Sequence, residues 1–338
     1  MKEEYGFNIG DVRIPGRIAL APMAGYTEYP FRAVVAGFGC PLAVTPLVSA
    51  KGLSMGNRSS AAILRKGPGD AEVVAGQVFG ADPKAMADAA WHVADVGFDL
   101  VDVNLGCPVR KVHRQSAGAA LTADLELLRK VVKAVVRASP IPVTAKIRVG
   151  LSDDTINGPE VAKVLEGEGV VCVAVHGRTV VQGFSGRSDP DRIAEVVNEV
   201  EIPVVANGDV TTPPKAKELL ERTGAAAIMI GRAALRAPDL IARADEYIRT
   251  GAEPPAADVD VLFDAYVRLF DLTANAYGDE RAAKIIRKFV INLAKGFPGA
   301  RRLREKGAAV SSREEYINVL DEMQRTTPAN PSSSAVRV

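Results

Sequence analysis

The chain has 338 residues, of which 47% are apolar and 25% are charged, and its formal net charge is +1. This composition is typical of a soluble globular protein with one large α/β domain and a smaller appendage, and it excludes a surface that binds polyanions uniformly. We find no apolar run long enough to cross a bilayer, and the polar start MKEEY argues against a secretory signal. Cys40, Cys107 and Cys172 form no CxxC pair and adjoin no histidine, so we expect no metal site, no disulfides and a reducing, cytoplasmic environment.

Eight short apolar runs typical of β-strands follow one another along the chain. They are residues 18–23, 42–47, 72–78, 100–104, 142–147, 171–176, 203–206 and 226–230. Alanine-rich stretches with helical periodicity lie between them, such as 83–96, 125–138, 158–168 and 213–221. Strands alternating with helices indicate βαβ units and a parallel sheet, and eight such units favour a (β/α)8 TIM barrel over a doubly wound sheet. A Rossmann fold would have GxGxxG after its first strand, where this sequence reads APMAG.

The pattern changes after Pro238. Residues from about 240 to 325 show helical periodicity without clear strands, interrupted at 251–255, which predicts a C-terminal helical domain docked on the barrel. We therefore expect a catalytic barrel domain over residues 1–240 and a helical domain over 241–325. The tail 326–338 is rich in proline and serine, and we expect it to be disordered.

The segment VDVNLGCP at 101–108 ends the fourth predicted strand with a carboxamide, Asn104, and a thiol, Cys107. Catalytic groups of (β/α)8 barrels come from the carboxyl ends of strands, so Cys107 is a candidate catalytic residue. Cys40 precedes the second strand and Cys172 opens the sixth, which predicts structural roles for both. The segment alone leaves open the alternative that Cys107 is a buried small hydrophobe.

Further polar residues end the neighbouring predicted strands. Gln77 ends the third strand, Lys146 and Arg148 end the fifth, and His176 ends the sixth, followed by Gly177-Arg178-Thr179. Burying an unpaired ammonium or amide costs free energy, so a shared site explains these residues better than a packed core does.

The last two strands end in Asn207-Gly208-Asp209 and Gly231-Arg232. Many barrels bind a phosphate between these two loops with backbone N–H groups, and an arginine there can add a bidentate contact. We therefore expect a cofactor or substrate that carries a phosphate. The alternative is two ordinary glycine turns.

A cluster of basic residues lies in the helical region, opposed within its own stretch by Glu305 alone. It consists of Arg281, Lys284, Arg287, Lys288, Lys295, Arg301, Arg302, Arg304 and Lys306. On a helix, Arg281, Lys284 and Lys288 share one face, which could follow a phosphate backbone. The alternative is a solvated helix face.

These motifs together resemble the tRNA-dihydrouridine synthase family, specifically its DusB-like bacterial branch, over residues 15–305. The resemblance rests on APMAGYTEYPFR (21–32), SAKGL (49–53), GQ (76–77), DVNLGCPVRK (102–111), GA (118–119), KIR (146–148), HGRT (176–179), NGD (207–209) and GR (231–232). The most specific part is Asn104-x-Gly106-Cys107-Pro108 with Gly118 downstream.

The resemblance implies an FMN-dependent flavoprotein that reduces the C5–C6 bond of selected uridines in tRNA, with electrons from NADPH. It implies that Pro22, Met23 and Ala24 border the isoalloxazine and that Gln77, Lys146 and His176 contact it. It assigns the FMN phosphate to Asn207, Gly208, Asp209, Gly231 and Arg232.

The same resemblance implies that a hydride passes from reduced FMN to uracil C6 while Cys107 protonates C5. Asn104 is expected to orient the uracil. Further substrate contacts are expected from Arg148, Arg178, Lys284, Arg287 and Lys288, the last three on the helical domain that would bind tRNA. The sequence implies neither a membrane nor a protein partner, and NADH remains open as an electron donor.

The sequence departs from the family pattern at several positions. Relatives often carry a glutamate in the second strand where this chain has Thr45, and a glycine where it has Arg236. In the helical region, Phe289 replaces a histidine, and Asn292-Leu293 replaces an aromatic pair. These departures leave open which uridine position of the tRNA is modified. Two other functions also remain open, namely an FMN barrel that reduces a free pyrimidine or another small molecule and an RNA-binding barrel without catalysis.

Overall fold

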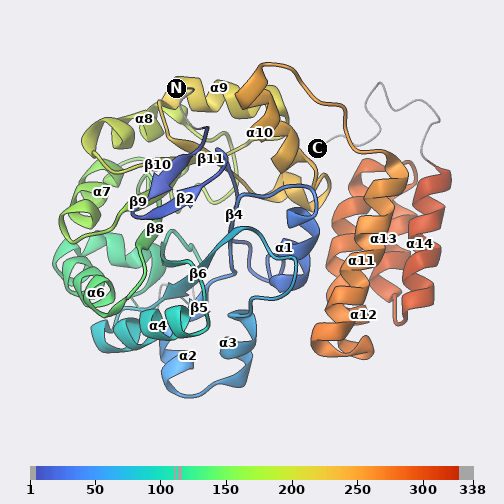
Figure 1. Cartoon of the computed structure of the whole chain (residues 1–338), viewed down its shortest axis with the longest axis horizontal. Helices are drawn as coiled ribbons and strands as arrows, with labels where there is room; N and C mark the ends of the chain where they lie inside the picture. Colours follow the sequence, from blue (N-terminus) through green and yellow to red (C-terminus); the bar gives the residue numbers. More distant parts are fainter. Residues whose placement is uncertain (1–4, 110–111, 113–115, 327–338) are drawn as a thin grey trace.

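The computed structural model describes residues 5–109, 112 and 116–326 (Figure 1). Arg110 and Lys111, the last two residues of the motif at 102–111, and residues 327–338 of the expected disordered tail lie outside the described residues. Within the described part, a barrel of strands and helices stands beside a separate group of helices. No helix there combines the length and hydropathy needed to span a membrane.

Eight parallel strands form the barrel wall, and each pairs with the next around the ring. They are β3 (Ile18–Leu20), β4 (Leu42–Val44), β6 (Val73–Phe79), β7 (Leu100–Leu105), β8 (Val143–Arg148), β9 (Cys172–His176), β10 (Val204–Asn207) and β11 (Ala227–Ile230). β11 pairs with β3 and closes the ring, while the two-residue β5 (Val48–Ser49) adds a short pairing to β6. The predicted (β/α)8 TIM barrel is confirmed, and each of its strands overlaps a predicted one.

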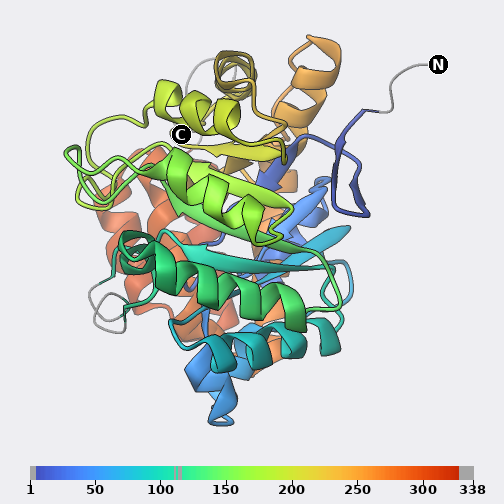
Figure 2. The ribbon, with the colours of Figure 1, turned by 90° about the vertical axis from the view of Figure 1, so that its left-hand side faces the viewer.

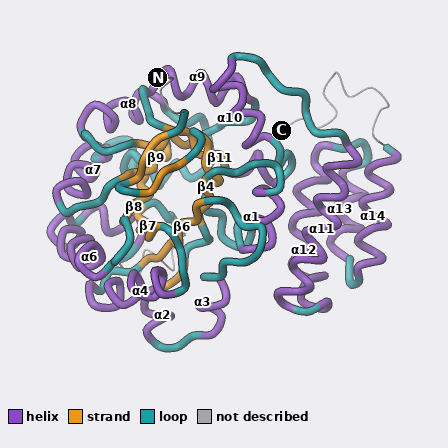
Figure 3. Tube along the Cα trace, viewed as in Figure 1, coloured by secondary structure: helices purple, strands orange, loops and turns teal. Residues whose placement is uncertain are grey.

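Helices surround the strands, as the tube in Figure 3 shows. They are α1 (Tyr29–Ala36), α2 (Ala50–Ser54), α3 (Arg58–Ile63), α4 (Pro83–Asp95), α6 (Leu125–Ala138), α7 (Gly158–Gly167), α8 (Pro190–Glu199), α9 (Pro213–Thr223) and α10 (Leu240–Thr250), with short 3-10 helices at Gly118–Ala123 and Arg232–Leu235. The side chains of Asp82, Asp124 and Thr212 cap helix starts by accepting backbone N–H bonds. α6 buries Leu128, Val131, Val132 and Val135, the spacing of a single helix face.

A hairpin that the sequence did not predict precedes the barrel. β1 (Phe7–Ile9) pairs with the antiparallel β2 (Val12–Ile14). Ile9 and Ile14 are buried in one cluster with residues that open barrel strands, such as Leu42 and Cys172. The hairpin therefore covers the amino-terminal end of the barrel, opposite the strand ends that carry the polar side chains.

The C-terminal helices form a bundle beside α1 (Figure 1). They are α11 (Val259–Tyr277), α12 (Asp279–Leu293), α13 (Ala300–Ala309) and α14 (Arg313–Arg325), with a short 3-10 helix at Ala294–Gly296. Tyr316 stacks on Phe270 with ring centres 5.5 Å apart, and its hydroxyl donates to the carbonyl oxygen of Tyr266. Figure 2 looks across α6 and α7 of the barrel wall, with this bundle behind the strands.

α10 packs against α9 and β3, so it lies on the barrel wall although the chain division expected at residue 240 assigns it to the helical domain. Packing alone would place the division in the segment 251–258 that follows α10. Residues 241–325 as a functional tRNA-binding unit stay a prediction.

Candidate active site at the carboxyl ends of the strands

The strand register brings polar residues from β7 to β10 to one edge of the barrel. Asn104 pairs with Lys146, Arg148 pairs with His176, and His176 also pairs with Asn207. Because neighbouring parallel strands end together, these side chains surround one end of the barrel. The expected grouping of strand-end residues is therefore present in the fold.

Gln77 joins β6 to β7 through its side chain. Its Nε2 donates to Asp102 Oδ2 at 2.7 Å, and its Oε1 accepts from Asn104 Nδ2 at 2.9 Å. Thr144 Oγ1 donates to the other Asp102 oxygen at 2.6 Å. Thr45, where relatives often carry a glutamate, accepts from the backbone N–H of Gln77 at 2.8 Å. Gln77 is fully buried in this network, so its expected flavin contact stays a prediction.

Cys107 lies in the turn directly after β7 and is half-buried. Asn104 Oδ1 accepts from its backbone N–H at 3.0 Å, which fixes the turn. Gly118, with φ of +61°, approaches so closely that a Cβ there would lie 3.3 Å from the Cys107 Cβ. Burial raises the pKa of the Cys107 thiol, against the opposing effect of the Arg148 cation, and this favours the protonated form.

Lys146 is half-buried at the same edge, where Nζ donates to Asn207 Oδ1 at 3.0 Å. Asn207 Nδ2 in turn donates to the carbonyl oxygen of Met229 at 2.8 Å, so the amide cannot rotate freely. Burial, with a further contribution from the Arg148 cation, lowers the pKa of Lys146 to about 8, although Asp102 acts in the opposite direction. A half-buried ammonium with remaining donor capacity is suited to an anionic or carbonyl-rich ligand.

Four cations interact with His176 at this edge and make the local electrostatic field positive, namely Lys146, Arg148, Arg178 and Arg232. Burial, and then Lys146, Arg148, Arg178 and Arg232, lower the pKa of His176 to about 2. The imidazole is therefore neutral at any ordinary pH, and the site attracts anions.

The two glycine turns after β10 and β11 lie near these cationic side chains. Asp209 has φ of +52°, and its carboxylate accepts from Arg178 Nη2 at 2.7 Å and from the Ser188 backbone N–H at 2.8 Å. Arg232 stands 3.6 Å from the same carboxylate and is more than half exposed. A carboxylate repels phosphate, so any phosphate contact of Asp209 is left to its backbone N–H. A Cβ at Gly208 would lie 2.0 Å from Ser188 Oγ, so glycine is required there.

Arg148 and Arg178, both expected to contact the substrate, are 6% and 2% exposed. Arg148 donates to the carbonyl oxygens of Gly106, Thr179 and Gly183. Arg178 donates in the same way to Ser185 and Gly186, as well as to Asp209. Both guanidinium groups therefore brace the loop after β9, and their expected contact with the substrate stays a prediction.

That braced loop carries Phe184, which sequence reasoning did not single out. Its ring is 59% exposed, and the Arg232 guanidinium lies 4.5 Å from its centre. No motif or spacing pointed to it, because an aromatic residue in a loop has no periodic pattern that would reveal its neighbours.

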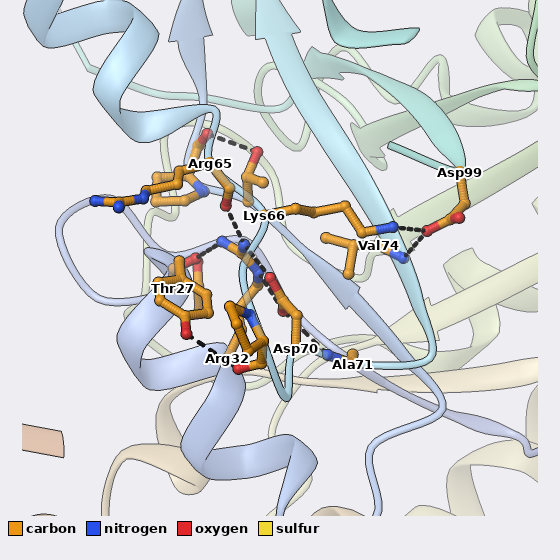
Figure 4. Close-up of polar contacts among 12 residues, drawn as sticks. Thr27, Arg32, Arg65, Lys66, Asp70, Ala71, Val74 and Asp99 are labelled. Atoms are coloured by element: carbon orange, nitrogen blue, oxygen red, sulfur yellow. Dashed lines mark hydrogen bonds and ion pairs between the residues drawn. The ribbon is translucent and has the colours of Figure 1, made fainter. Parts of the chain in front are cut away.

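The loop after β3, which contains Pro22, Met23 and Ala24, is held in place through Thr27 by the buried Arg32 (Figure 4). Thr27 Oγ1 accepts from the backbone N–H of Met23 at 2.8 Å. Arg32 has no exposed surface, and it donates to the carbonyl oxygens of Thr27 and Arg65. Its ion pair with Asp70 uses two nitrogens, at 3.0 Å and 2.7 Å.

The basic residues of the helical bundle have more acidic partners than their own stretch of sequence suggested. Glu280 pairs with Lys284 at 2.6 Å, and Glu322 of α14 pairs with both Arg302 and Lys306. The expectation that Glu305 alone opposes the cluster is therefore wrong, because Glu280 lies one turn before Lys284 on α12 and the fold brings Glu322 of α14 beside α13. Arg287 donates from Nε to the carbonyl oxygen of Val310.

Lys288 points toward the barrel and lies at the junction of the two parts. Its Nζ is 5.3 Å from the ring centre of Tyr26, in the loop after β3. Phe289 packs edge-on against the same ring, and Asn292 Nδ2 donates to the Tyr26 hydroxyl at 2.8 Å. Phe289 and Asn292, which depart from the family pattern, thus bind the bundle to the barrel, and Leu293 is buried.

Comparisons with known proteins show a family match over most of the chain. The family described as dihydrouridine synthase (Dus) matches residues 19–328, which span both barrel and bundle. A probable tRNA-dihydrouridine synthase of Rickettsia bellii is 36% identical over 315 residues, covering 93% of this chain and 96% of the relative. The tRNA-dihydrouridine synthase B of Pseudomonas aeruginosa is 38% identical over 296 residues, covering 88% of this chain and 89% of the relative.

Proposed function

This chain belongs to the dihydrouridine synthase family, and on that premise we propose that it reduces the C5–C6 bond of selected uridines in tRNA with bound FMN and electrons from NADPH. The observation that carries the proposal is the shared edge of the barrel, which brings the Cys107 thiol and the half-buried Lys146 ammonium together with the cations of the neighbouring strand ends and loops. The family match extends over this whole edge.

The residues present fit FMN. Lys146 has three N–H donors, of which one has an acceptor among the described residues, so it can serve a second, anionic partner. Arg232 and the glycine turns at Gly208 and Gly231 supply a cation and backbone N–H groups for a phosphate. Bound FMN would accept electrons from NADPH and supply hydride chemistry at C6 of the uracil ring.

Cys107 is assigned the proton for C5. Burial raises the pKa of its thiol, so the group carries a proton at neutral pH and suits an acid better than a nucleophile. Asn104 holds the turn that presents this thiol and is itself positioned to orient the base.

The helical bundle is assigned to tRNA binding. A target base must leave its stack to reach the end of a barrel, at a cost of a few kcal/mol. Lys284 and Lys288 on α12, with Arg287 between them, would attract the phosphate backbone and offset part of that cost. Lys288 lies next to the loop after β3, which connects this surface to the reaction site.

Two measurements test the proposal. The purified protein should show a flavin absorbance spectrum, and deletion of its gene should remove dihydrouridine at a defined tRNA position, detected by mass spectrometry. Restoring the gene should return the modification, whereas restoring a Cys107→Ala version should not.

A colourless protein that cannot be reconstituted with FMN would reject flavin chemistry. Unchanged dihydrouridine in the deletion strain, together with no turnover on added unmodified tRNA, would reject tRNA as the substrate. Flavin-dependent reduction of a free pyrimidine in that case would identify a small-molecule reductase instead.

A further inference from the structure

The hydrogen bonds that connect Cys107 with Asp102 all run in one direction. The backbone N–H of Cys107 can only donate, and it donates to Asn104 Oδ1 at 3.0 Å. The Asn104 oxygen therefore faces the turn, with the Gly106 N–H also at 3.4 Å from it. Its Nδ2 must then face Gln77, and the 2.9 Å contact joins it to Gln77 Oε1.

At the opposite end of this hydrogen-bond chain, Asp102 requires the same donor-to-acceptor direction. An ionised carboxylate can only accept, so it takes the Nε2 proton of Gln77 at 2.7 Å and leaves Oε1 toward Asn104. A proton on the other Asp102 oxygen would be donated to Thr144 Oγ1, which lies 2.6 Å away and can pass its own proton to the Val101 carbonyl oxygen at 3.3 Å. The orientation of both amides is the same in either case.

An isolated amide can rotate by half a turn and offer either an oxygen or an NH₂ group to a ligand. Asn104 is held at both ends, because its oxygen accepts from two backbone N–H groups and its NH₂ group donates to Gln77 Oε1, which Asp102 orients. Its remaining capacity is one N–H, whereas Gln77 retains one N–H and one lone pair of Oε1. Any ligand that touches Asn104 must therefore present an acceptor.

We propose that Asp102 is a positioning residue, which acts through Gln77 to keep Asn104 as a hydrogen-bond donor toward a carbonyl oxygen of the target pyrimidine. The proposal rests on the proposed function, because it assumes that Asn104 meets the base. Uracil offers two ring carbonyl oxygens, whereas cytosine replaces one of them with an amino donor. Where Asn104 meets the oxygen at position 4, its fixed orientation selects uridine against cytidine.

The test exchanges the amide at position 77 and the carboxylate at position 102. Gln77→Glu places a second carboxylate against Asp102 in a buried site, where one of the two must bind a proton. Asp102→Asn alone keeps the orientation, because the oxygen of the new amide can accept from Gln77 while its NH₂ group donates to Thr144. In the double variant Gln77→Glu/Asp102→Asn, the new amide donates to the new carboxylate, and that carboxylate still accepts from Asn104.

We expect Gln77→Glu to lower kcat/KM on tRNA by about 10- to 100-fold at about pH 8, with activity returning as the pH falls. Asp102→Asn should lower kcat/KM less than Gln77→Glu does. The double variant should have a kcat/KM within about threefold of that of Asp102→Asn, and its kcat/KM should depend less on pH. A double variant no more active than Gln77→Glu would overturn the proposal. FMN content, read from the visible spectrum, shows whether each variant retains the cofactor site.

Asn104→Asp tests the donor itself, since its second oxygen replaces the N–H. It should raise KM for tRNA or abolish turnover, while NADPH oxidation by the bound flavin continues. Normal turnover of Asn104→Asp would also overturn the proposal.

A readout that needs no activity separates this proposal from the proposed function. In Gln77→Glu the paired carboxylates bind a proton more tightly when folded than unfolded, so the free energy of unfolding should fall as pH rises from about 5.5 to about 8. The double variant should not show this fall. Lys146 of β8 and Cys172 of β9 are the other titratable groups that interact with Asp102, and they are unchanged in every variant. If the wild-type protein makes no dihydrouridine, the proposed function fails, while this comparison still tests whether the side chains at positions 77 and 102 interact directly.

Discussion

Arg148 Nε donates a 3.0 Å hydrogen bond to the carbonyl oxygen of Gly106, the residue directly before Cys107. Its Nη1 donates to Thr179 and Gly183 in the loop after β9, so one buried side chain joins that loop to the turn that carries the thiol. The position of the thiol therefore depends on a residue that ends a different strand.

Arg148→Lys is expected to keep the charge but to lose part of this connection, because an ammonium cannot match the planar fork of donors. We expect a loss of about 1–3 kcal/mol in the free energy of unfolding, and a fall of about tenfold or more in the rate of tRNA reduction. Urea unfolding and single-turnover kinetics measure the two effects. Arg129→Lys on the exposed side of α6 is the control, and an equal effect there would contradict the assignment.

Cys107→Ala is expected to keep FMN and its reduction by NADPH but to lose about 10²- to 10⁴-fold in turnover on tRNA, because the proton for C5 has no donor. Rapid mixing separates the two steps, since flavin reduction is followed without tRNA. Cys107→Ser keeps the size and should remain slow, because a hydroxyl holds its proton far more tightly than a thiol. Near-normal turnover in the alanine variant would disprove the role of Cys107.

The pH dependence of FMN binding is expected to follow Lys146, whose pKa lies at about 8. Above that pH the neutral amine no longer attracts the anionic cofactor, so FMN affinity should fall as the pH rises through about 8. Without FMN, the unfolded chain holds this proton up to a higher pH than the folded protein, so the free energy of unfolding should rise with pH over the same window.

Lys146→Met should remove both trends. Lys130→Met, on the exposed side of α6, should leave them in place. Fluorescence titration of FMN and urea unfolding at several pH values provide the data, and a pH profile unchanged by Lys146→Met would assign the titration to another group.

Lys284→Glu and Lys288→Glu are expected to weaken tRNA binding most strongly at low salt, while NADPH oxidation stays normal. Lys84→Glu is a matched control, because Lys84 and Lys284 are both exposed and both paired with an acid one helical turn away. Filter binding over a range of salt concentrations measures the effect. Equal weakening by Lys84→Glu would mean that net charge matters and the bundle surface does not.

Asp70→Asn is expected to destabilise the protein by about 3–5 kcal/mol, because it leaves the buried Arg32 guanidinium without its counter-ion. The loop that Arg32 holds through Thr27 should loosen at the same time, and FMN affinity should fall. Asp191→Asn breaks an exposed pair with Arg222 and should leave the urea midpoint close to that of the wild type. Similar midpoints for the two variants would contradict the role of the buried pair.

The sequence by itself determined the barrel and the edge at which its polar groups meet. Strand and helix periods are local properties of the chain, so the eight strands could be found without knowing their neighbours. The order of strands then placed Cys107 at the carboxyl end of β7 and separated it from Cys40 and Cys172, which the structure shows buried.

Only the tertiary structure decided what each polar side chain does at that edge. The direction of the bonds through Gln77 depends on Asp102 and on the Cys107 backbone, which β6 and β7 bring together. Arg148 is buried against carbonyl oxygens of distant loops, and Glu322 meets the basic cluster from another helix. Burial and hydrogen-bond partners come from residues far apart in the chain, and no local period records them.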